Sequence, residues 1–199
     1  VPFPELRDRM DRFRIRMEAD NPDWEMAAFF GHINQYYFTG TMQDGMLLIP
    51  RDDEPVFWVR RSYERALDES LFPEIRPMKS FRDAFAGTGH LPGTVYLETE
   101  LVPLALLERL RKYFPFAHVG AVDMPAAKVR SVKSAYELLL LEQAGKIHRR
   151  VLEDLVPGIL REEMSEAEFG SEVYSVMIEE GHHGVVRFGM FETEIVVGQ

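Results

Sequence analysis

The 199-residue chain contains no cysteine. This absence excludes disulfide bonds, thiolate metal ligands and a cysteine nucleophile. Long apolar runs are also missing, because no stretch approaches the roughly 18–20 residues that a helix needs to span a bilayer. The first residues, Val1-Pro2-Phe3-Pro4, include neither the basic nor the apolar segment of a signal peptide. We therefore expect a cytoplasmic protein with no membrane partner.

Positive charge is scarce as well. The chain has 23 Lys and Arg against 33 Asp and Glu, which gives a net charge of −10. Phosphate binding needs a basic face, so the total argues against a nucleic-acid partner, although a local basic patch is compatible with it. The apolar and charged fractions, 46% and 28%, are ordinary for a globular protein. The length permits one large domain, or one and a half small ones.

Helical and strand patterns alternate along the first part of the chain. The apolar spacing predicts helices over 5–19, 62–70, 81–85 and 103–114, and strands over 24–31, 45–50, 55–60, 74–78, 94–98 and 117–122. Residues 32–40 are expected to form a short irregular or helical turn. The charged residues Arg51–Glu54 join two of the strands in a hairpin. This alternation predicts an α/β domain with a mixed, partly parallel sheet.

A hinge over 127–133 and a well-marked helix start divide the chain. Ser134 can cap the helix, and Glu137 can return a hydrogen bond to the N–H of the cap. The apolar spacing behind this pair continues to Leu155, and Pro157-Gly158 is expected to end the helix. We therefore place an N-terminal domain over 1–125 and a linker with the start of a second domain over 126–199.

The second domain shows one more helix and a strand pattern. A second capping box, Ser165-Glu166-Ala167-Glu168, begins a helix that Gly181 is expected to end. Residues 185–198 have the apolar spacing of strands. The last apolar run, Ile195–Gly198, has no turn or partner strand after it, so we expect this chain to be the front part of a longer protein.

No complete catalytic or metal-binding set can be assembled from these residues. His182 and His183 are adjacent, and neighbouring strand residues point to opposite faces, so the pair is poorly placed to chelate one ion. His148 lies on the apolar side of its helix, where a half-buried structural histidine is expected. The remaining histidines lack an acidic partner at useful spacing and are expected to be structural or exposed: His32, His90 and His118.

Other motifs also favour structural interpretations. The acidic runs Asp52–Glu54 and Glu162-Glu163 are typical of solvated turns and helix starts. Gly87-Thr88-Gly89 lacks the third glycine or the lysine of a phosphate-binding loop, and neither G-x-S-x-G nor H-E-x-x-H occurs. The aromatic run Tyr36-Tyr37-Phe38 remains open to two interpretations. It is either a plug of the core, or a cleft wall or intersubunit contact.

Three motifs follow one another along the chain. The first is Asn34–Gly40 with the strand Gly45–Pro50, and the second is Arg130-Ser131-Val132-Lys133-Ser134-x-x-Glu137. The third is Phe191-Glu192-Thr193-Glu194-Ile195-Val196-Val197-Gly198. In this order and spacing they resemble the creatinase/prolidase family of metallopeptidases, especially its Xaa-Pro aminopeptidases and dipeptidases.

The resemblance implies an N-terminal creatinase-type α/β domain with a mixed sheet, followed by the incomplete start of a pita-bread α/β domain. It also implies two divalent metal ions (Mn²⁺, Co²⁺ or Zn²⁺) that activate water for attack on the bond before proline. The family's metal ligands lie after the strand that ends here at Gly198. We therefore assign no catalytic residue and no metal ligand to this chain, and we expect the chain alone to be inactive.

The same resemblance suggests one substrate-binding residue. Phe191 matches a position that lines the substrate pocket in relatives, and a core-strand role is the alternative. The implied partners are a proline-containing peptide and a second copy in a homodimer, with Tyr36–Phe38 as a candidate contact. Two rival hypotheses remain: a metal-free creatinase-like pseudoenzyme that binds peptides or proteins, and a creatine-type amidinohydrolase.

Overall fold

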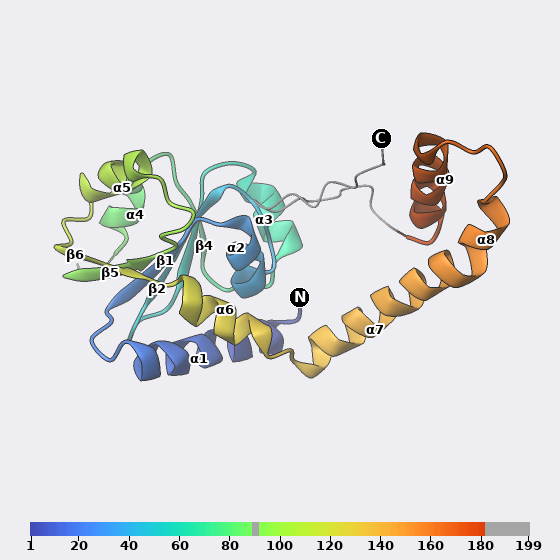
Figure 1. Cartoon of the computed structure of the whole chain (residues 1–199). Coiled ribbons are helices and arrows are strands. Elements are labelled where there is room, and N and C mark those ends of the chain that lie inside the picture. Colours follow the sequence, from blue (N-terminus) through green and yellow to red (C-terminus); the bar gives the residue numbers. More distant parts are fainter. Residues whose placement is uncertain (89–91, 182–199) are drawn as a thin grey trace. The chain divides into compact units, whose positions relative to one another are not determined.

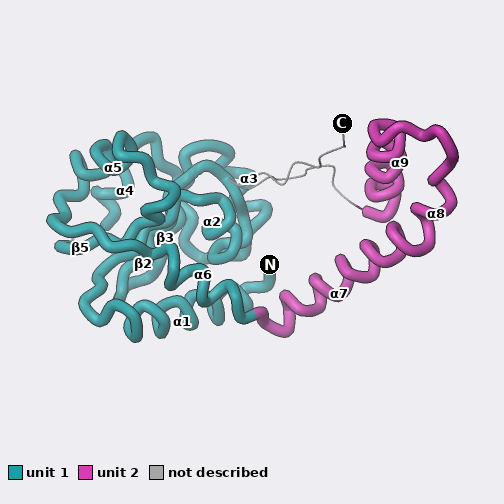
Figure 2. Tube along the Cα trace, viewed as in Figure 1, with its two compact units in different colours: residues 1–132 teal, residues 133–199 magenta. Residues whose placement is uncertain are grey.

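The computed structural model describes residues 1–88 and 92–181 (Figure 1). The chain divides into two compact units, 1–132 and 133–199 (Figure 2). The hinge predicted over 127–133 is wrong for most of its length, because residues 127–131 belong to helix α6 (Asp123–Ser131). Val129 of α6 is buried in the core of the first unit, and this burial keeps the segment helical. The strand pattern predicted over 185–198 lies outside the described residues.

A six-stranded mixed sheet forms the centre of the first unit, as the sequence predicted. Its strand order is β4-β3-β2-β1-β5-β6. The strands are β1 (Met26–Phe29), β2 (Gly45–Pro50), β3 (Val56–Val59), β4 (Ile75–Pro77), β5 (Thr94–Leu97) and β6 (His118–Ala121). The β1–β2 and β2–β3 pairs are antiparallel, and the β1–β5, β5–β6 and β3–β4 pairs are parallel. The predicted hairpin is therefore confirmed as β2 and β3.

Helices cover both faces of this sheet. They are α1 (Phe3–Asp20), α2 (His32–Thr39), α3 (Tyr63–Glu69), α4 (Phe81–Ala86), α5 (Leu104–Arg111) and α6. Figure 1 shows α4 and α5 on one side of the sheet and α1 with α6 on the other. Successive strand residues point to opposite faces. Accordingly, Ala27 and Phe29 pack in the core under α1, whereas Met26 and Ala28 pack in the core under α4 and α5.

Aromatic rings fill the core beneath α1. The Phe13 ring is fully buried and meets Trp24, Phe29 and Phe38 edge to face, with ring centroids 6.2, 5.4 and 5.2 Å away. Edge-to-face pairs add to the free energy gained from burying the rings. Large buried side chains on both faces make the first unit a fully packed α/β domain.

The described part of the second unit is helical. It comprises α7 (Ala135–Arg149), a π-helical segment η1 (Arg150–Leu155), α8 (Val156–Ile159) and α9 (Glu166–Glu179). Both predicted capping boxes are present, at Ser134 and at Ser165. The predicted helix end at Pro157-Gly158 is wrong, because helical backbone continues to Ile159. Pro157 lies in the first turn of α8, where a missing N–H is tolerated.

The apolar side chains of α7 stay exposed. None of its residues is buried, and the exposed fractions of Leu138–Leu141 range from 47% to 61%. His148 is exposed too, which corrects the half-buried position expected for it. Among the described residues, no helix is both long enough and apolar enough to cross a bilayer.

Candidate functional site

A buried carboxylate connects the first two sequence motifs. Glu98 follows β5 and is 3% exposed. One of its oxygens, Oε2, accepts hydrogen bonds from the N–H groups of Phe30 and Gly31 at 2.6 and 2.7 Å, and Oε1 accepts from Asn34 Nδ2 at 2.7 Å. Asn34 Oδ1 in turn accepts from Arg130 Nη1 at 3.1 Å. The asparagine of the first motif and the arginine of the second are thus hydrogen-bonded to each other.

The position of Glu98 follows from local backbone chemistry. Gly31 is the N-cap of α2 and offers no side chain to satisfy the first N–H groups of the helix. A carboxylate at a helix N-terminus supplies those acceptors and interacts favourably with the helix dipole. A Cβ atom on Gly31 would lie 2.6 Å from Glu98 Oε1, so glycine at this position allows the close approach. The cluster therefore fixes the start of α2.

The end of α2 is held by the second half of the first motif. Gly40 has φ = +80° in the left-handed region, which glycine adopts without the steric cost of a Cβ. The Thr39 hydroxyl donates to the carbonyl of Gln35 at 2.7 Å. Just beyond, the Thr41 hydroxyl donates to Glu69 Oε2 at 2.7 Å. This bond, with others from Arg65 and Gln43, holds the pKa of Glu69 below its usual value.

The aromatic run of α2 is mainly a core plug. Phe38 is fully buried and Tyr37 is 6% exposed, whereas Tyr36 is 45% exposed. Arg9 covers the Tyr37 ring at 4.5 Å from its centroid and donates from Nη1 to the Tyr37 carbonyl at 2.8 Å. Arg9 is itself buried, at 3% exposure. Only Tyr36 has the exposure that a surface contact requires.

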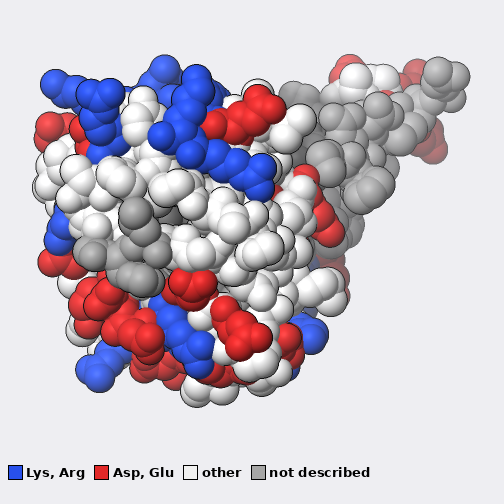
Figure 3. Space-filling model, turned by 90° about the vertical axis from the view of Figure 1, so that its left-hand side faces the viewer, with Lys and Arg blue, Asp and Glu red and all other residues white. Residues whose placement is uncertain are grey.

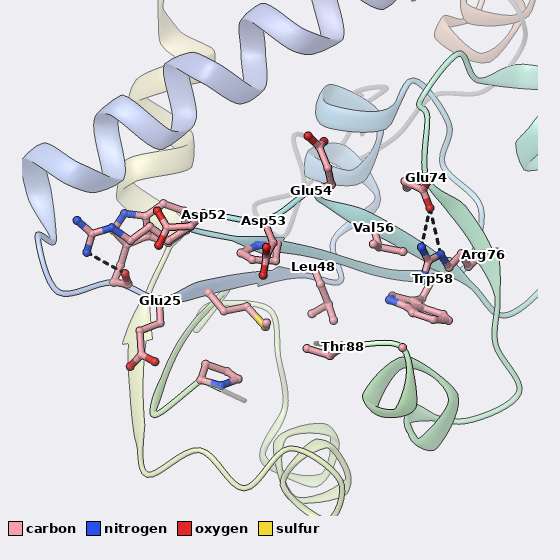
Figure 4. A pocket seen from close by; sticks show the side chains of 16 residues that line it. Glu25, Leu48, Asp52, Asp53, Glu54, Val56, Trp58, Glu74, Arg76 and Thr88 are labelled. Atoms are coloured by element: carbon pink, nitrogen blue, oxygen red, sulfur yellow. Dashed lines mark hydrogen bonds and ion pairs between the residues drawn. The ribbon is translucent and has the colours of Figure 1, made fainter. Parts of the chain in front are cut away.

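A cavity of about 750 Å³ lies at one end of the sheet, beside the β2–β3 hairpin loop. Buried strand side chains line its floor: Met26, Leu48 and Trp58. Its rim includes the loop carboxylates of Asp52, Asp53 and Glu54, together with Glu25 and Glu74. Figure 4 shows Leu48 and Trp58 between the hairpin loop and Thr88.

Three charged residues of the rim, Glu25, Glu74 and Arg76, already have hydrogen-bond or ion-pair partners. Glu25 accepts from the N–H groups of Gly93 and Thr94 at 3.0 and 3.1 Å. Glu74 pairs with Arg76 at 2.8 Å, and the Arg76 guanidinium lies 5.7 Å from the centroid of the Trp58 ring. An apolar floor with a net acidic rim suits a cationic group. Among the described lining residues, the hydroxyl of Thr88 donates to the carbonyl of Ala84 at 2.8 Å rather than to a rim carboxylate, so the two do not form the hydrogen-bonded nucleophile–base pair of a catalytic site.

The remaining described sequence candidates lie at exposed positions. His32 and His118 are exposed, as expected, and the acidic pair Glu162-Glu163 is also exposed. The acidic run at 52–54 is solvated and forms part of the cavity rim. In the described ranges 1–88 and 92–181, no three His, Asp or Glu side chains form a group that could hold a metal ion.

Several candidates lie outside the described residues. These are the substrate-pocket candidate Phe191, the pair His182-His183, and His90. The assignment of Phe191 therefore remains a prediction. Sequence reasoning also missed Glu98, whose only signal was a single carboxylate directly after an apolar strand.

Comparisons with known proteins agree with the motif analysis. Residues 9–132, more than half of the chain, match the model of the creatinase/prolidase N-terminal domain. A search of curated protein sequences gives no match. The family match ends where the first structural unit ends.

Solved structures share the fold. The prolidase from Pyrococcus horikoshii OT3 aligns with a TM-score of 0.75 at 22% identity, over 88% of this chain and 50% of that one. The Xaa-Pro dipeptidase from Bacillus anthracis aligns with a TM-score of 0.76 at 17% identity, over 89% and 50%. The X-Pro aminopeptidase from Thermotoga maritima MSB8 gives 0.69 at 23%, over 86% and 50%. The chain spans about half the length of each of these proteins.

Proposed function

The chain belongs to the family of creatinase/prolidase N-terminal domains, and from this membership we propose that it is the N-terminal portion of a peptidase that cleaves the bond before proline. The proposed whole protein is an Xaa-Pro aminopeptidase or dipeptidase. It acts on proline-containing peptides, as a homodimer in the cytoplasm. The printed names of the structural neighbours, prolidase, Xaa-Pro dipeptidase and X-Pro aminopeptidase, support this proposal.

One observation supports the proposal most strongly. The second unit starts with a capped helix, α7, directly after the family match ends at residue 132. The four consecutive leucines of α7, Leu138–Leu141, are exposed. Consecutive helix residues point in different directions, so these leucines expose apolar side chains around most of the helix, and such surface calls for packing partners. We infer that further chain, forming the rest of a catalytic domain, covers it in the whole protein.

The two divalent ions (Mn²⁺, Co²⁺ or Zn²⁺) belong to the proposed whole protein. The described residues do not fit such a centre, because no three potential ligands come together in these ranges. Two-metal sites need several carboxylate or imidazole ligands around ions a few ångströms apart. We propose that the metal cage lies outside residues 1–88 and 92–181.

An activity assay tests this proposal. The 199-residue chain and the full-length gene product would each be incubated with an Xaa-Pro dipeptide and Mn²⁺ or Co²⁺, and free proline would be measured. We expect turnover by the full-length protein and none by the chain alone. Turnover by the chain alone would refute the placement of the reactive centre. An inert full-length protein that still binds peptides would favour the metal-free binding module.

A further inference from the structure

A second cavity, independent of the proposed peptidase site, is lined by positive charge. It measures about 310 Å³ and lies between α4, α5 and the ends of β3 and β4. We call it the basic groove. Its lining residues are Arg60, Met78, Lys79, Ser80, Phe81, Leu106, Arg109, Lys112 and Tyr113. Four of the nine carry a positive charge and none carries a negative charge, although the whole chain has a net charge of −10.

Charges of the two signs are unevenly distributed over one face of the first unit. Figure 3 shows more Lys and Arg at the top of this face, the end where α4 and α5 lie, and more Asp and Glu at the bottom, with both signs present at each end. Clustered charge of one sign around a concave surface raises the local concentration of ligands of the opposite sign. The groove therefore favours an anion even though the protein as a whole repels one.

Most of the groove's cations make no ion pair, although the carboxylate of Asp83 interacts electrostatically with Lys79 and Arg82. Arg60 pairs with Asp44 at 2.9 Å. Within the part of the chain that the structure describes, Lys79, Arg109 and Lys112 make no ion pair, and all three are exposed. Arg82, next to the groove, lies 5.9 Å from the centroid of the Tyr113 ring. Three or more cations are thus available to a bound anion.

The floor of the groove adds an apolar requirement. Met78 is buried, and Phe81, Leu106 and Tyr113 are partly buried. Aromatic and aliphatic walls bind planar or apolar bodies, while peripheral polar groups fix orientation. The volume is at the low end for small-molecule sites, which fits one ring with its head group. An extended nucleic acid would need a longer basic track than this groove provides.

We propose that the basic groove binds a small amphipathic anion: an aromatic or apolar body that carries a phosphate or a carboxylate. The guanidinium of Arg109 and the ammonium groups of Lys79 and Lys112 hold the anionic group, since guanidinium matches the geometry of both oxyanions. Phe81 and Tyr113 contact the body. Neither anion source is excluded by the lining, so the experiment distinguishes them.

Ligand-observed NMR titration of the 199-residue chain tests this proposal, with phenyl phosphate, benzoate, inorganic phosphate and neutral benzyl alcohol as probes. We expect phenyl phosphate, benzoate or both to bind at millimolar or lower concentration, and more tightly than inorganic phosphate and benzyl alcohol. Tighter binding of phenyl phosphate identifies a phosphate ligand, and tighter binding of benzoate identifies a carboxylate ligand. Raising the salt concentration weakens the interaction.

Two double variants decide whether the groove is responsible. R109Q/K112Q removes two groove cations. We expect affinity for the aromatic anion to fall about tenfold, because the effects of losing two exposed charge interactions multiply. R7Q/R149Q removes two exposed cations elsewhere and is expected to bind like the wild type. F81A tests the apolar floor and lowers affinity for phenyl phosphate without changing that for inorganic phosphate.

Three results would overturn the proposal. The first is no binding of either aromatic anion at 10 mM or below, in a chain shown by circular dichroism to be folded. The second is an equal loss of affinity in the groove variant and the control variant. The third is that the tighter-binding aromatic anion binds no better than both inorganic phosphate and benzyl alcohol, because that would remove any joint role for the cations and the apolar floor. Activity of the full-length peptidase enters none of these readouts.

Discussion

Replacement of Glu98 by glutamine tests the buried cluster that joins the two motifs. Each of the three hydrogen bonds to the carboxylate becomes weaker, because bonds to charged groups stabilise by roughly 1.5–3 kcal/mol and neutral ones by roughly 0.5–1.5. In addition, the new amide would direct N–H groups at Asn34 Nδ2, which now donates to Oε1. A 180° rotation of the Asn34 side-chain amide would remove this donor–donor repulsion. It would also direct the Asn34 NH₂ group at the Arg130 guanidinium, which now donates to Asn34 Oδ1.

The expected loss follows from these bonds. Two bonds weakened by about 1 kcal/mol each and the loss of the bond from Asn34, worth roughly 1.5–3 kcal/mol, give about 4 kcal/mol. Release of the cost of burying a charge offsets part of this sum. We therefore expect E98Q to lower the free energy of unfolding of the first unit by about 2 kcal/mol, a large share of typical domain stability.

Urea unfolding followed by tryptophan fluorescence measures this loss. Both tryptophans of the chain, Trp24 and Trp58, lie in the first unit and are buried, so the signal reports on that unit. The matched control is E100Q, which changes an exposed glutamate two residues later and should alter stability by less than about 0.5 kcal/mol. If both variants unfold at the same urea concentration, Glu98 does not anchor α2 as we infer.

Three further predictions follow from the described contacts. G45A is expected to destabilise the first unit by about 2 kcal/mol, because the new Cβ would clash with a backbone carbonyl of β3; unchanged urea unfolding would refute this. S134A removes the cap of α7 and should lower helix stability by about 1 kcal/mol, seen as reduced ellipticity on heating. The lowered pKa of Glu69 means that its stabilisation is present above the ordinary value of 4.5 and disappears as pH falls through the folded value. The stability difference between the wild type and E69Q should therefore shrink between pH 6 and pH 3, and a difference that stays constant over this range would contradict the prediction.

Most helices and strands could be predicted from patterns within short segments of the sequence. The short apolar runs that form β1 and β2 and the two serine capping boxes are properties of short segments, and the structure confirms both. The predicted helix end at Pro157-Gly158 was wrong because proline disrupts a helix from an interior position and is tolerated in the first turn. The π-helical segment before it shifts the register and places Pro157 in a new first turn.

The candidate sites depended on contacts that no local pattern records. Glu98 is buried only because β5 pairs with β1 and so reaches the start of α2. The basic groove collects residues that lie in or next to β3, β4, α4 and α5, from Arg60 to Tyr113, 53 positions apart in the sequence. In each case the chemistry arises from the strand order β4-β3-β2-β1-β5-β6, which the sequence pattern did not predict.

Metal content measures most directly whether these 199 residues form a scaffold that lacks the reactive centre. Elemental analysis would be performed on the full-length protein and on the 199-residue chain after both are loaded with Mn²⁺ and desalted. The proposal predicts about two equivalents of metal in the full-length protein, as in other two-metal hydrolases, and none in the chain. Stoichiometric metal in the chain, abolished when one of its own histidines is replaced, would contradict it.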